Sequence, residues 1–441
     1  MEQRRKNLTQ LFIPICLETL LYMLSGMVDT LMLSSVNDQA VGAVGTANTY
    51  IGIFIIMFSV ISSGMVAVMT QNIGAGRPGV AYQARQLGLV FNAALGVIMS
   101  LFLSLGAGTI LSGVGVADAL MQPAKTYLQI VGGFCILNAL IPICSSYLRA
   151  FGFSKEPLYA SIIGNVINFC LNAFFLFVLH KGVAGVDTAT VISRIINLVI
   201  VVLLGAVLVK AKQYPERESN RAVMGQIIRI GLPSACETAI YNVSMTLVIR
   251  FLNQMDAQGL NVTARSYTMQ ITNFSYCVGA ALAQANAIMT GWHIGAKEYD
   301  ACDRGTKKAA VIGVIVAVIL ETVFTLCSGW IMQLFSKDPQ MVSLVGKLLA
   351  IDIVLEIGRV TNLVYGQALK TSGDAVFPVV MGACFMILCS VGGTYLFGIR
   401  LGLLAVGAYI GMTGDECVRA VGMYLRWKSG KWKEKGLVKS R

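Results

Sequence analysis

Charged residues are scarce in this sequence. Of its 441 residues, 13% are Asp, Glu, Lys or Arg, whereas 56% are hydrophobic and the mean hydropathy is +0.71. Soluble globular domains carry about a quarter charged residues, because polar groups must cover their surface. The deficit therefore excludes a soluble protein and indicates an integral membrane protein with several spans.

Histidine is also scarce, and the common catalytic and metal-binding patterns are missing. The chain has only two histidines, His180 and His293, and no HExxH, GxSxG or GxxxxGK sequence. Its eleven cysteines include no CxxC pair, and ten lie in apolar segments, which is typical of small packing residues. These absences argue against a hydrolase, a structural zinc site and a disulfide framework. We expect no enzymatic activity and no cofactor.

The positive net charge does not indicate a nucleic-acid binder. The chain has 34 Lys and Arg against 22 Asp and Glu, but the basic residues occupy short segments between apolar runs. With the N-terminus inside, we assign 24 of the 34 basic residues to cytoplasmic segments and four to external loops. This bias predicts a multi-pass protein of the cell membrane with both termini in the cytoplasm, and no nucleic-acid partner.

Long apolar runs determine the predicted fold class. Runs of about twenty apolar residues are long enough to cross a hydrocarbon core of ~30 Å as helices. We predict twelve such spans and hence an all-α integral membrane protein. The predicted spans cover approximately residues 10–33, 44–70, 87–111, 124–148, 157–179, 185–209, 226–251, 263–291, 308–332, 341–367, 376–397 and 402–425.

The most polar connector divides the predicted spans into two groups of six. It contains the sequence Lys-Gln-Tyr-Pro-Glu-Arg-Glu-Ser-Asn-Arg. We therefore predict two six-helix lobes that are joined by a cytoplasmic linker and followed by a basic cytoplasmic tail. The N-terminal lobe, the linker, the C-terminal lobe and the tail cover residues 1–209, 210–229, 230–426 and 427–441, respectively.

The two predicted lobes share an internal repeat with an offset of 219–221 residues. Matches in the same order and on the same side of the membrane predict two parallel repeats, an architecture suited to alternating access. The basic residues Arg149 and Lys370 of the third match are expected to anchor to lipid headgroups. The matches are Pro14-x3-Glu18-Thr-x2-Tyr22 with Pro233-x3-Glu237-Thr-x2-Tyr241, Met69-Thr70 with Met289-Thr290, and Leu148-Arg149-x2-Gly152-x4-Pro157 with Leu369-Lys370-x2-Gly373-x4-Pro378.

Asp29 is the candidate site for a coupling ion or proton. It lies in the first predicted span, where an ionised group costs ~2.5 kcal/mol or more and therefore generally lines a cavity and has a function. The equivalent position of the second half is Val248, so the repeat does not explain the carboxylate as part of the scaffold. Asn168 and Asn172 of the fifth span are spaced i, i+4 and face the same side of their helix. A carboxylate that faces amide oxygens can accept a proton or a small cation.

Two further groups of charged residues lie within predicted spans. Glu18 and Glu237 occupy equivalent repeat positions and either form structural ion pairs or contact a cation in a cavity. Asp352, Glu356 and Arg359 share one face of the tenth span. They either form a salt-bridge cluster or line a cavity.

Four short motifs complete the pattern: Val28-Asp29-Thr30, Gly74-Ala75-Gly76, Leu148-Arg149-Ala150-x-Gly152-x4-Pro157 and Asn168-x3-Asn172. Together with the twelve spans and the half-chain repeat, they resemble the multidrug and toxic compound extrusion (MATE) family, and its bacterial DinF-like branch in particular. The resemblance covers essentially the whole chain. It implies export of organic cations driven by inward movement of protons or sodium.

The resemblance also implies a cation site in the N-terminal lobe. Carried over residue by residue, this site is formed by Asp29, Asn168, Asn172 and Thr190. Asp29, Asn168 and Asn172 would be the metal ligands if sodium is the coupling ion. The second position of the fifth span is commonly Asp in the family but is Asn172 here, so the site carries less negative charge.

We therefore expect a secondary-active antiporter that exports amphipathic organic cations and drugs in exchange for protons or sodium. Its partners would be small organic cations and membrane lipids, and we expect a monomer. The carboxylate positions described for the second lobe of the NorM-like branch fall on Tyr241 and Arg359, so that site is expected to be absent. The alternative is a flippase for a lipid-linked saccharide or cell-wall precursor, which requires Arg or Lys in its cavity to hold pyrophosphate.

Overall fold

The computed structural model describes the chain from residue 6 to residue 438, apart from residues 35–37, 114–115, 117 and 257. The described residues form helices, turns and loops and contain no β-strand. Each predicted span corresponds to one helix or to a short series of consecutive helical segments. The predicted all-α fold, with twelve transmembrane helices in two six-helix lobes, is confirmed.

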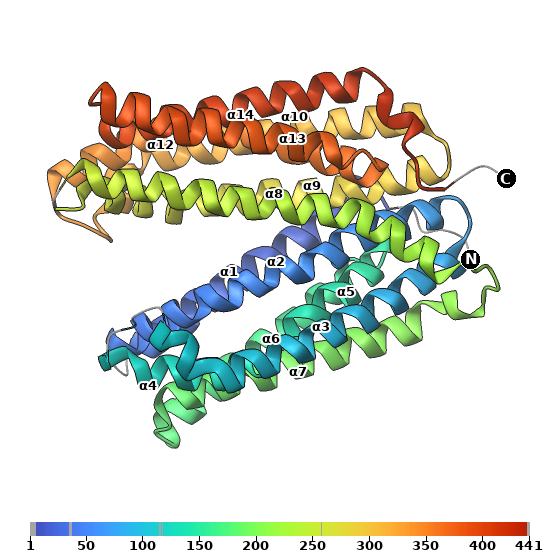
Figure 1. Cartoon of the computed structure of the whole chain (residues 1–441), viewed down its shortest axis with the longest axis horizontal. Helices are drawn as coiled ribbons and strands as arrows, with labels where there is room; N and C mark the ends of the chain where they lie inside the picture. The colour runs from blue at the N-terminus through green and yellow to red at the C-terminus, as the bar shows by residue number, and fades with distance from the viewer. Residues whose placement is uncertain (1–5, 35–37, 114–115, 117, 257, 439–441) are drawn as a thin grey trace. The chain divides into compact units, whose positions relative to one another are not determined.

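The helices of the first six spans run side by side in Figure 1. The fourth span is bent by 42° where Leu120–Gly132 meets Ile136–Ala150. Wider π-helical turns follow α4 at Leu128–Gly132 and α6 at Phe174–Val178. The helices are α1 (Leu8–Ser34), α2 (Asp38–Gly74), α3 (Pro78–Gly113), α4 (Asp118–Tyr127), α5 (Ile136–Ala150), α6 (Lys155–Ala173) and α7 (Gly182–Leu208).

The last six spans begin with a helix that contains a proline, Pro233. The ninth span combines α10 with the short α11, and the eleventh continues from α13 through π-helical turns at Met386–Val391 and Thr394–Arg400. The helices are α8 (Asn220–Met255), α9 (Leu260–Gly295), α10 (Tyr299–Leu326), α11 (Ser328–Met332), α12 (Pro339–Ser372), α13 (Val376–Phe385) and α14 (Leu404–Lys428).

The chain divides into two compact units, and the division falls between Leu232 and Pro233 within α8. We call them the first unit and the second unit. In the first unit α1 packs against α6, α6 against α7, and α2 against α3 and α5. In the second unit α12 is central, because it packs against α9, α10 and α14. Each unit contains one copy of the sequence repeat.

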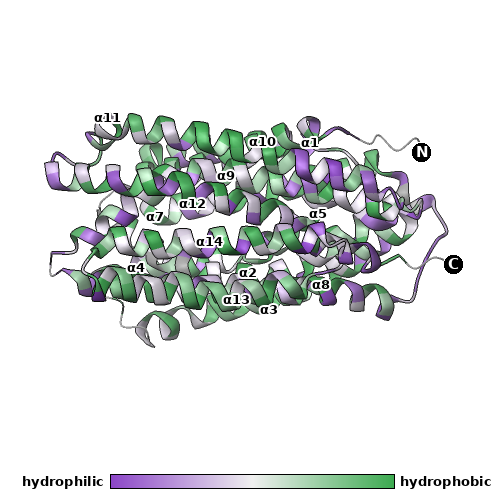
Figure 2. Cartoon of the chain, turned by 90° about the horizontal axis from the view of Figure 1, so that it is seen from above, coloured by the Kyte–Doolittle hydropathy of each residue, from purple (hydrophilic) through white to green (hydrophobic). Residues whose placement is uncertain are grey.

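The second unit has the more polar helices. Among the described residues, seven helical segments are long and apolar enough to span a membrane, and the bent fourth span makes eight. The other four predicted spans are α8, α9, α12 and α14. Figure 2 shows polar stretches within α9 and α12. Asp352 and Glu356 of α12 are buried within the second unit, so these charges do not prevent the helix from spanning the membrane.

Both units contain the same buried ion pair at equivalent repeat positions. Arg149 Nη2 lies 2.6 Å from Glu18 Oε2, and Lys370 Nζ lies 2.6 Å from Glu237 Oε2. The four side chains are only 10–15% exposed. The pairs join α1 to α5 in the first unit and α8 to α12 in the second. The expectation that Arg149 and Lys370 anchor to lipid headgroups is wrong, because carboxylates inside each unit hold these basic groups.

The residues that follow α14 pack back onto the second unit. Trp432 is 1% exposed and stacks on Trp427, with ring centroids 4.1 Å apart and an interplanar angle of 9°. Trp432 Nε1 donates to the carbonyl oxygen of Trp427, and Trp427 Nε1 donates to Asp303 Oδ1, both at 2.9 Å. The tryptophans thus fix the start of the tail, while Lys431 and Lys433 remain exposed.

We predict that Glu18→Gln lowers the stability of the protein by ~3 kcal/mol, because it removes the carboxylate that the buried Arg149 guanidinium faces. Glu237→Gln should act in the same way on Lys370. Thermal unfolding of the purified protein in detergent measures both effects. The control is Lys307→Gln, which removes an exposed pair with Asp303 and should leave the melting temperature unchanged. Equal melting of all three variants and the wild type would contradict the prediction.

Candidate functional site

Three helices of the first unit bring the predicted ion-site residues into one hydrogen-bonded chain. Asn172 Nδ2 donates to Asp29 Oδ1 at 2.6 Å and to Asn168 Oδ1 at 3.2 Å. Asn168 Nδ2 donates to Thr190 Oγ1 at 3.4 Å. Asp29 lies on α1, both asparagines on α6 and Thr190 on α7, so the chain of bonds connects three spans. The structure places all four residues together, and their role in ion binding stays a prediction.

The i, i+4 spacing on α6 explains this arrangement. It puts both amides on one face of the helix, which packs against α1 and α7. Asn168 and Asn172 are 5% and 0% exposed, whereas Asp29 is partly exposed. The Thr190 hydroxyl donates to the carbonyl oxygen of Val186 at 3.0 Å and therefore accepts from Asn168. Asn172 Oδ1 has no hydrogen-bond partner among the described residues.

A second buried carboxylate, Asp187, belongs to the same region and was missed in the sequence. It lies on α7, three residues before Thr190, and is 1% exposed. Neither of its oxygens has a hydrogen-bond partner in the described part of the chain. It is close enough to Asp29 for the two carboxylates to interact electrostatically. The sequence did contain an indication of this residue, because an acidic side chain within an apolar span is expected to be functional.

Arg194 supplies positive charge to this region. It interacts electrostatically with Asp29, and its Nη1 donates to Asn138 Oδ1 on α5 at 3.0 Å. Arg194 thus acts on Asp29, whereas the interaction described for Asp187 is with the Asp29 carboxylate, so the region carries one negative charge in excess when both acids are ionised. Buried oxygens without partners and an excess negative charge together suit a proton or a small hard cation.

A cavity of about 210 Å³ lies inside the second unit. Aromatic rings and thioethers adapt to varied organic groups, and carboxylates and ring faces both attract cations. The cavity can therefore accept a small or partly inserted organic cation. Its walls include Tyr241, Tyr276, Tyr409, Met245, Asp352 and Glu416.

Two of the three charged residues predicted on the tenth span, Glu356 and Arg359, form a network with three residues of α14. Arg359 Nη1 lies 2.7 Å from Glu356 Oε1, and its Nε lies 3.7 Å from Glu416 Oε1. Arg419 pairs with Asp415 at 2.8 Å and with Glu416 at 2.9 Å. Glu356 and Arg359 thus belong to a salt-bridge cluster, and Arg359 also lines the cavity. The α14 residues were missed, although charges in a predicted span could have indicated them.

Gly358 allows α12 and α14 to approach closely at this network. A Cβ atom at this position would lie 2.9 Å from backbone atoms of Glu416 and Cys417. The close approach also lets Asn362 Nδ2 donate to Glu416 Oε2 at 3.0 Å. The absence of a side chain therefore sets the distance between the two halves of the network.

The chain has twelve membrane-spanning helices in two repeated units, and each unit contains buried ionisable side chains. This combination defines a polytopic membrane transporter. The chain belongs to the MatE family, whose model matches residues 14–174 and again residues 233–396. One match falls in each half of the internal repeat. Members of this family are transporters, and the protein is therefore a multi-pass membrane protein.

Similar proteins extend over almost the whole chain. YisQ of Bacillus subtilis, described as an uncharacterized transporter, is 33% identical over 96% of this chain and 94% of its own length. NorM of Thermotoga maritima, described as a probable multidrug resistance protein, is 23% identical over 98% of this chain and 94% of its own.

Solved structures share the fold. A crystal structure of a MATE protein in the bent conformation has a TM-score of 0.87 at 18% identity and covers 97% of this chain and 96% of its own. A multidrug resistance MATE family transporter in an outward-facing conformation has a TM-score of 0.86 at 18% identity, with coverage of 98% and 96%. At this identity the likeness concerns the arrangement of the helices.

We predict that Gly358→Ala destabilises the protein by ~1–3 kcal/mol, because the added methyl group would overlap the backbone of α14. Thermal unfolding in detergent measures the change. Gly305→Ala on α10 is the matched control, since a Cβ there meets no atom within 4 Å. It should leave the stability unchanged or raise it slightly. An unchanged melting temperature of Gly358→Ala would contradict the prediction, because it would mean that α12 and α14 can move apart without loss of stability.

Proposed function

We propose that this chain is a secondary-active antiporter that exports amphipathic organic cations in exchange for protons or Na⁺ by alternating access. The observation that carries the proposal is the hydrogen-bonded chain from Asp29 to Thr190, beside the unpartnered carboxylate of Asp187. Relatives described as multidrug resistance proteins support the substrate class. We further propose a monomer in the cell membrane with both termini in the cytoplasm, as the distribution of basic residues indicates.

Asp29 is the group proposed to load and release the coupling proton. As a carboxylate, it accepts a charge-assisted hydrogen bond from Asn172. Protonation removes the negative charge, weakens this bond and turns one oxygen into a donor. Because Asn172 also bonds Asn168, and Asn168 bonds Thr190, the change reaches α6 and α7 as well as α1. The protonation state of Asp29 would thus bias how three helices of the first unit pack.

Sodium is the alternative coupling ion, and the residues present fit it as transported cargo. Asp29, Asn168 and Asn172 offer carboxylate and amide oxygens, the ligand type that hard cations prefer. Asn172 Oδ1 and both oxygens of Asp187 have no partner among the described residues. Asp187 restores the second negative charge that Asn172 lacks relative to the common family pattern. Both coupling ions are therefore retained in the proposal.

The cavity of the second unit is the proposed contact for the organic cation. Asp352 and Glu416 provide negative charge, and Tyr276 and Tyr409 provide aromatic faces. Recognition by charge and ring faces tolerates varied shapes, which suits export of chemically different cations.

A flippase for an anionic lipid-linked saccharide has less support. Its pyrophosphate would need arginine or lysine side chains that are available for bidentate contacts. The cavity is lined by two arginines: Arg359 is held by Glu356 and Glu416, and Arg265 donates to the sulfur of Met245. Three carboxylates, those of Asp352, Asp415 and Glu416, line the cavity against these two arginines, and this balance favours cations over anions.

We predict that Asp29→Asn abolishes ion-driven export, because an amide neither ionises nor releases a proton at physiological pH. The purified protein is reconstituted into liposomes, and efflux of a fluorescent organic cation is followed under an imposed pH gradient or an imposed Na⁺ gradient. The wild type should respond to one of the gradients. Asp29→Asn should show only the rate without a gradient, and Asp187→Asn should reduce the driven rate.

Asp300→Asn is the control for this experiment, since Asp300 is an exposed residue at the start of α10 and should leave transport unchanged. Wild-type efflux by Asp29→Asn under both gradients would refute the coupling mechanism. Movement of a lipid-linked pyrophosphate, without export of the cation, would instead favour the flippase.

A further inference from the structure

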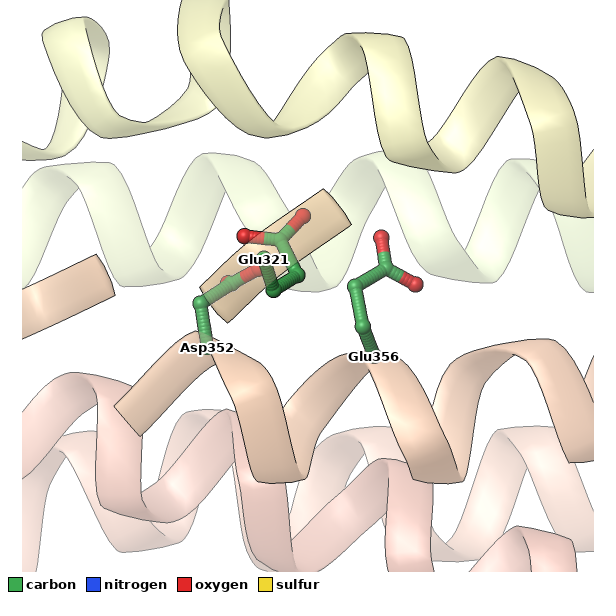
Figure 3. Close-up of side chains that lie close together, drawn as sticks. All are labelled: Glu321, Asp352 and Glu356. Atoms are coloured by element: carbon green, nitrogen blue, oxygen red, sulfur yellow. The ribbon is translucent and has the colours of Figure 1, made fainter. Parts of the chain in front are cut away.

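Three carboxylates that lie apart from the Asp29 region meet inside the second unit. Glu321 lies on α10, and Asp352 and Glu356 lie one turn apart on the facing side of α12. Figure 3 shows their side chains converging in the space between the two helices. One oxygen from each lies within 4.8 Å of the others. The side chains are 0%, 2% and 0% exposed, respectively.

Most of the oxygens in this group have no hydrogen-bond partner. Among the described residues, this holds for both oxygens of Glu321, for Asp352 Oδ2 and for Glu356 Oε2. The hydroxyl of Ser275 on α9 lies beside Glu321 but does not meet it in hydrogen-bond geometry. A fully buried carboxylate without any donor is rare, because its desolvation is then uncompensated. Glu321 therefore needs an occupant that the protein itself does not provide.

The balance of buried charges in the second unit also indicates that a positive charge is missing. Six described carboxylates of this unit are buried, namely Glu321, Asp352, Glu356, Asp374, Asp415 and Glu416, and Asp374 pairs with Arg426 at 2.7 Å. In the described part of the chain, the ion pairs of Arg359 and Arg419 involve Glu356, Asp415 and Glu416. No described ion pair reaches Glu321 or Asp352. Arg265 is also buried and lines the same cavity as Asp352. Apart from the pair of Asp374 with Arg426, five buried carboxylates therefore stand against three arginines, Arg265, Arg359 and Arg419, and two negative charges remain to be compensated.

We propose that Glu321, Asp352 and Glu356 bind a small hard cation, of the size of Na⁺ or Ca²⁺, between α10 and α12. Oxygens that share one ion at ~2.4 Å lie at most ~4.8 Å apart, and the three carboxylates meet this requirement. The donors are oxygen only, which disfavours softer metals that prefer sulfur or nitrogen. One divalent ion, or one monovalent ion together with one proton, would neutralise the excess charge.

The site is separate from the coupling residues around Asp29, and it shares Asp352 with the cavity proposed for the organic cation. It lies in the other unit, and Glu321 comes from a span in which the sequence indicated no functional residue. It also differs from the second-lobe positions that fall on Tyr241 and Arg359. When occupied, it would link α10 to α12, so its ion would stabilise the second unit whichever ion drives transport.

Cation-dependent stability of the purified full-length protein tests the proposal. After chelation, NaCl or CaCl₂ is added at constant ionic strength, with choline chloride as the balancing salt, and thermal unfolding is followed. The melting temperature of the wild type should rise with the concentration of one of the two ions, because a ligand that binds only the folded state stabilises it. Direct binding of radioactive sodium or calcium provides the second readout.

The variants locate the site. Glu321→Gln should lower the apparent affinity by more than ~10-fold, the lower end of the loss caused by outer-shell changes at metal sites. Without added cation, it should melt no lower than the wild type, because it removes an uncompensated buried charge. Asp29→Asn should retain the cation effect, and so should the exposed control Asp300→Asn. Asp352→Asn replaces Glu321→Gln if that variant does not fold.

Three results would overturn the proposal. The first is a wild type that neither binds nor is stabilised by either ion, which would mean that protons alone occupy the cluster. The second is a cation effect that persists undiminished when Glu321→Gln or Asp352→Asn is combined with Asp29→Asn. The third is an effect lost in Asp29→Asn, which would place the only ion in the first unit. Failure of export by Asp29→Asn is read in a different assay and leaves this test unaffected.

Discussion

The structure depends on how charged side chains are stabilised where they are buried between helices, with little access to water. Desolvation of an ionised group costs several kcal/mol, so each buried charge needs a counter-charge, hydrogen-bond donors or a bound ion. The two units meet this demand differently. In the first, Asp29 accepts a hydrogen bond from the amide of Asn172 and interacts with the charge of Arg194 at longer range. The second connects carboxylates to arginines, as in the pair of Arg359 with Glu356.

The two halves of the internal repeat share their structural ion pair but not their ionisable site. The ion pair of Glu18 with Arg149 is reproduced by Glu237 with Lys370, at equal N–O distances. The Asp29 position is instead occupied in the second unit by Val248, which is fully buried in an apolar core. A duplicated frame therefore holds an ionisable site in one unit and a charge network in the other. This difference lets one unit respond to an ion without the other responding in the same way.

The sequence predicted features that depend on local pattern and missed those that depend on contacts between distant helices. Span length is a local property, so the twelve helices were predicted well, apart from the bend of the fourth. The i, i+4 spacing and the family resemblance placed Asn172 with Asp29. Asp187 and Glu321 were missed because only packing decides which helix face meets which neighbour. The same limit made Arg149 look like a headgroup anchor, although its partner lies more than a hundred residues away.

The stacked tryptophans at the end of α14 have a practical consequence. The chain contains four tryptophans, and two of them are Trp427 and Trp432. Stacked indoles with ring centroids 4.1 Å apart share their excitation, and one of them also bonds Asp303 on α10. Detachment of the tail would therefore change the emission of the intact protein without any added label. A purification tag joined directly after Trp432 would disturb the same contact, so a tag needs a spacer beyond the docked segment.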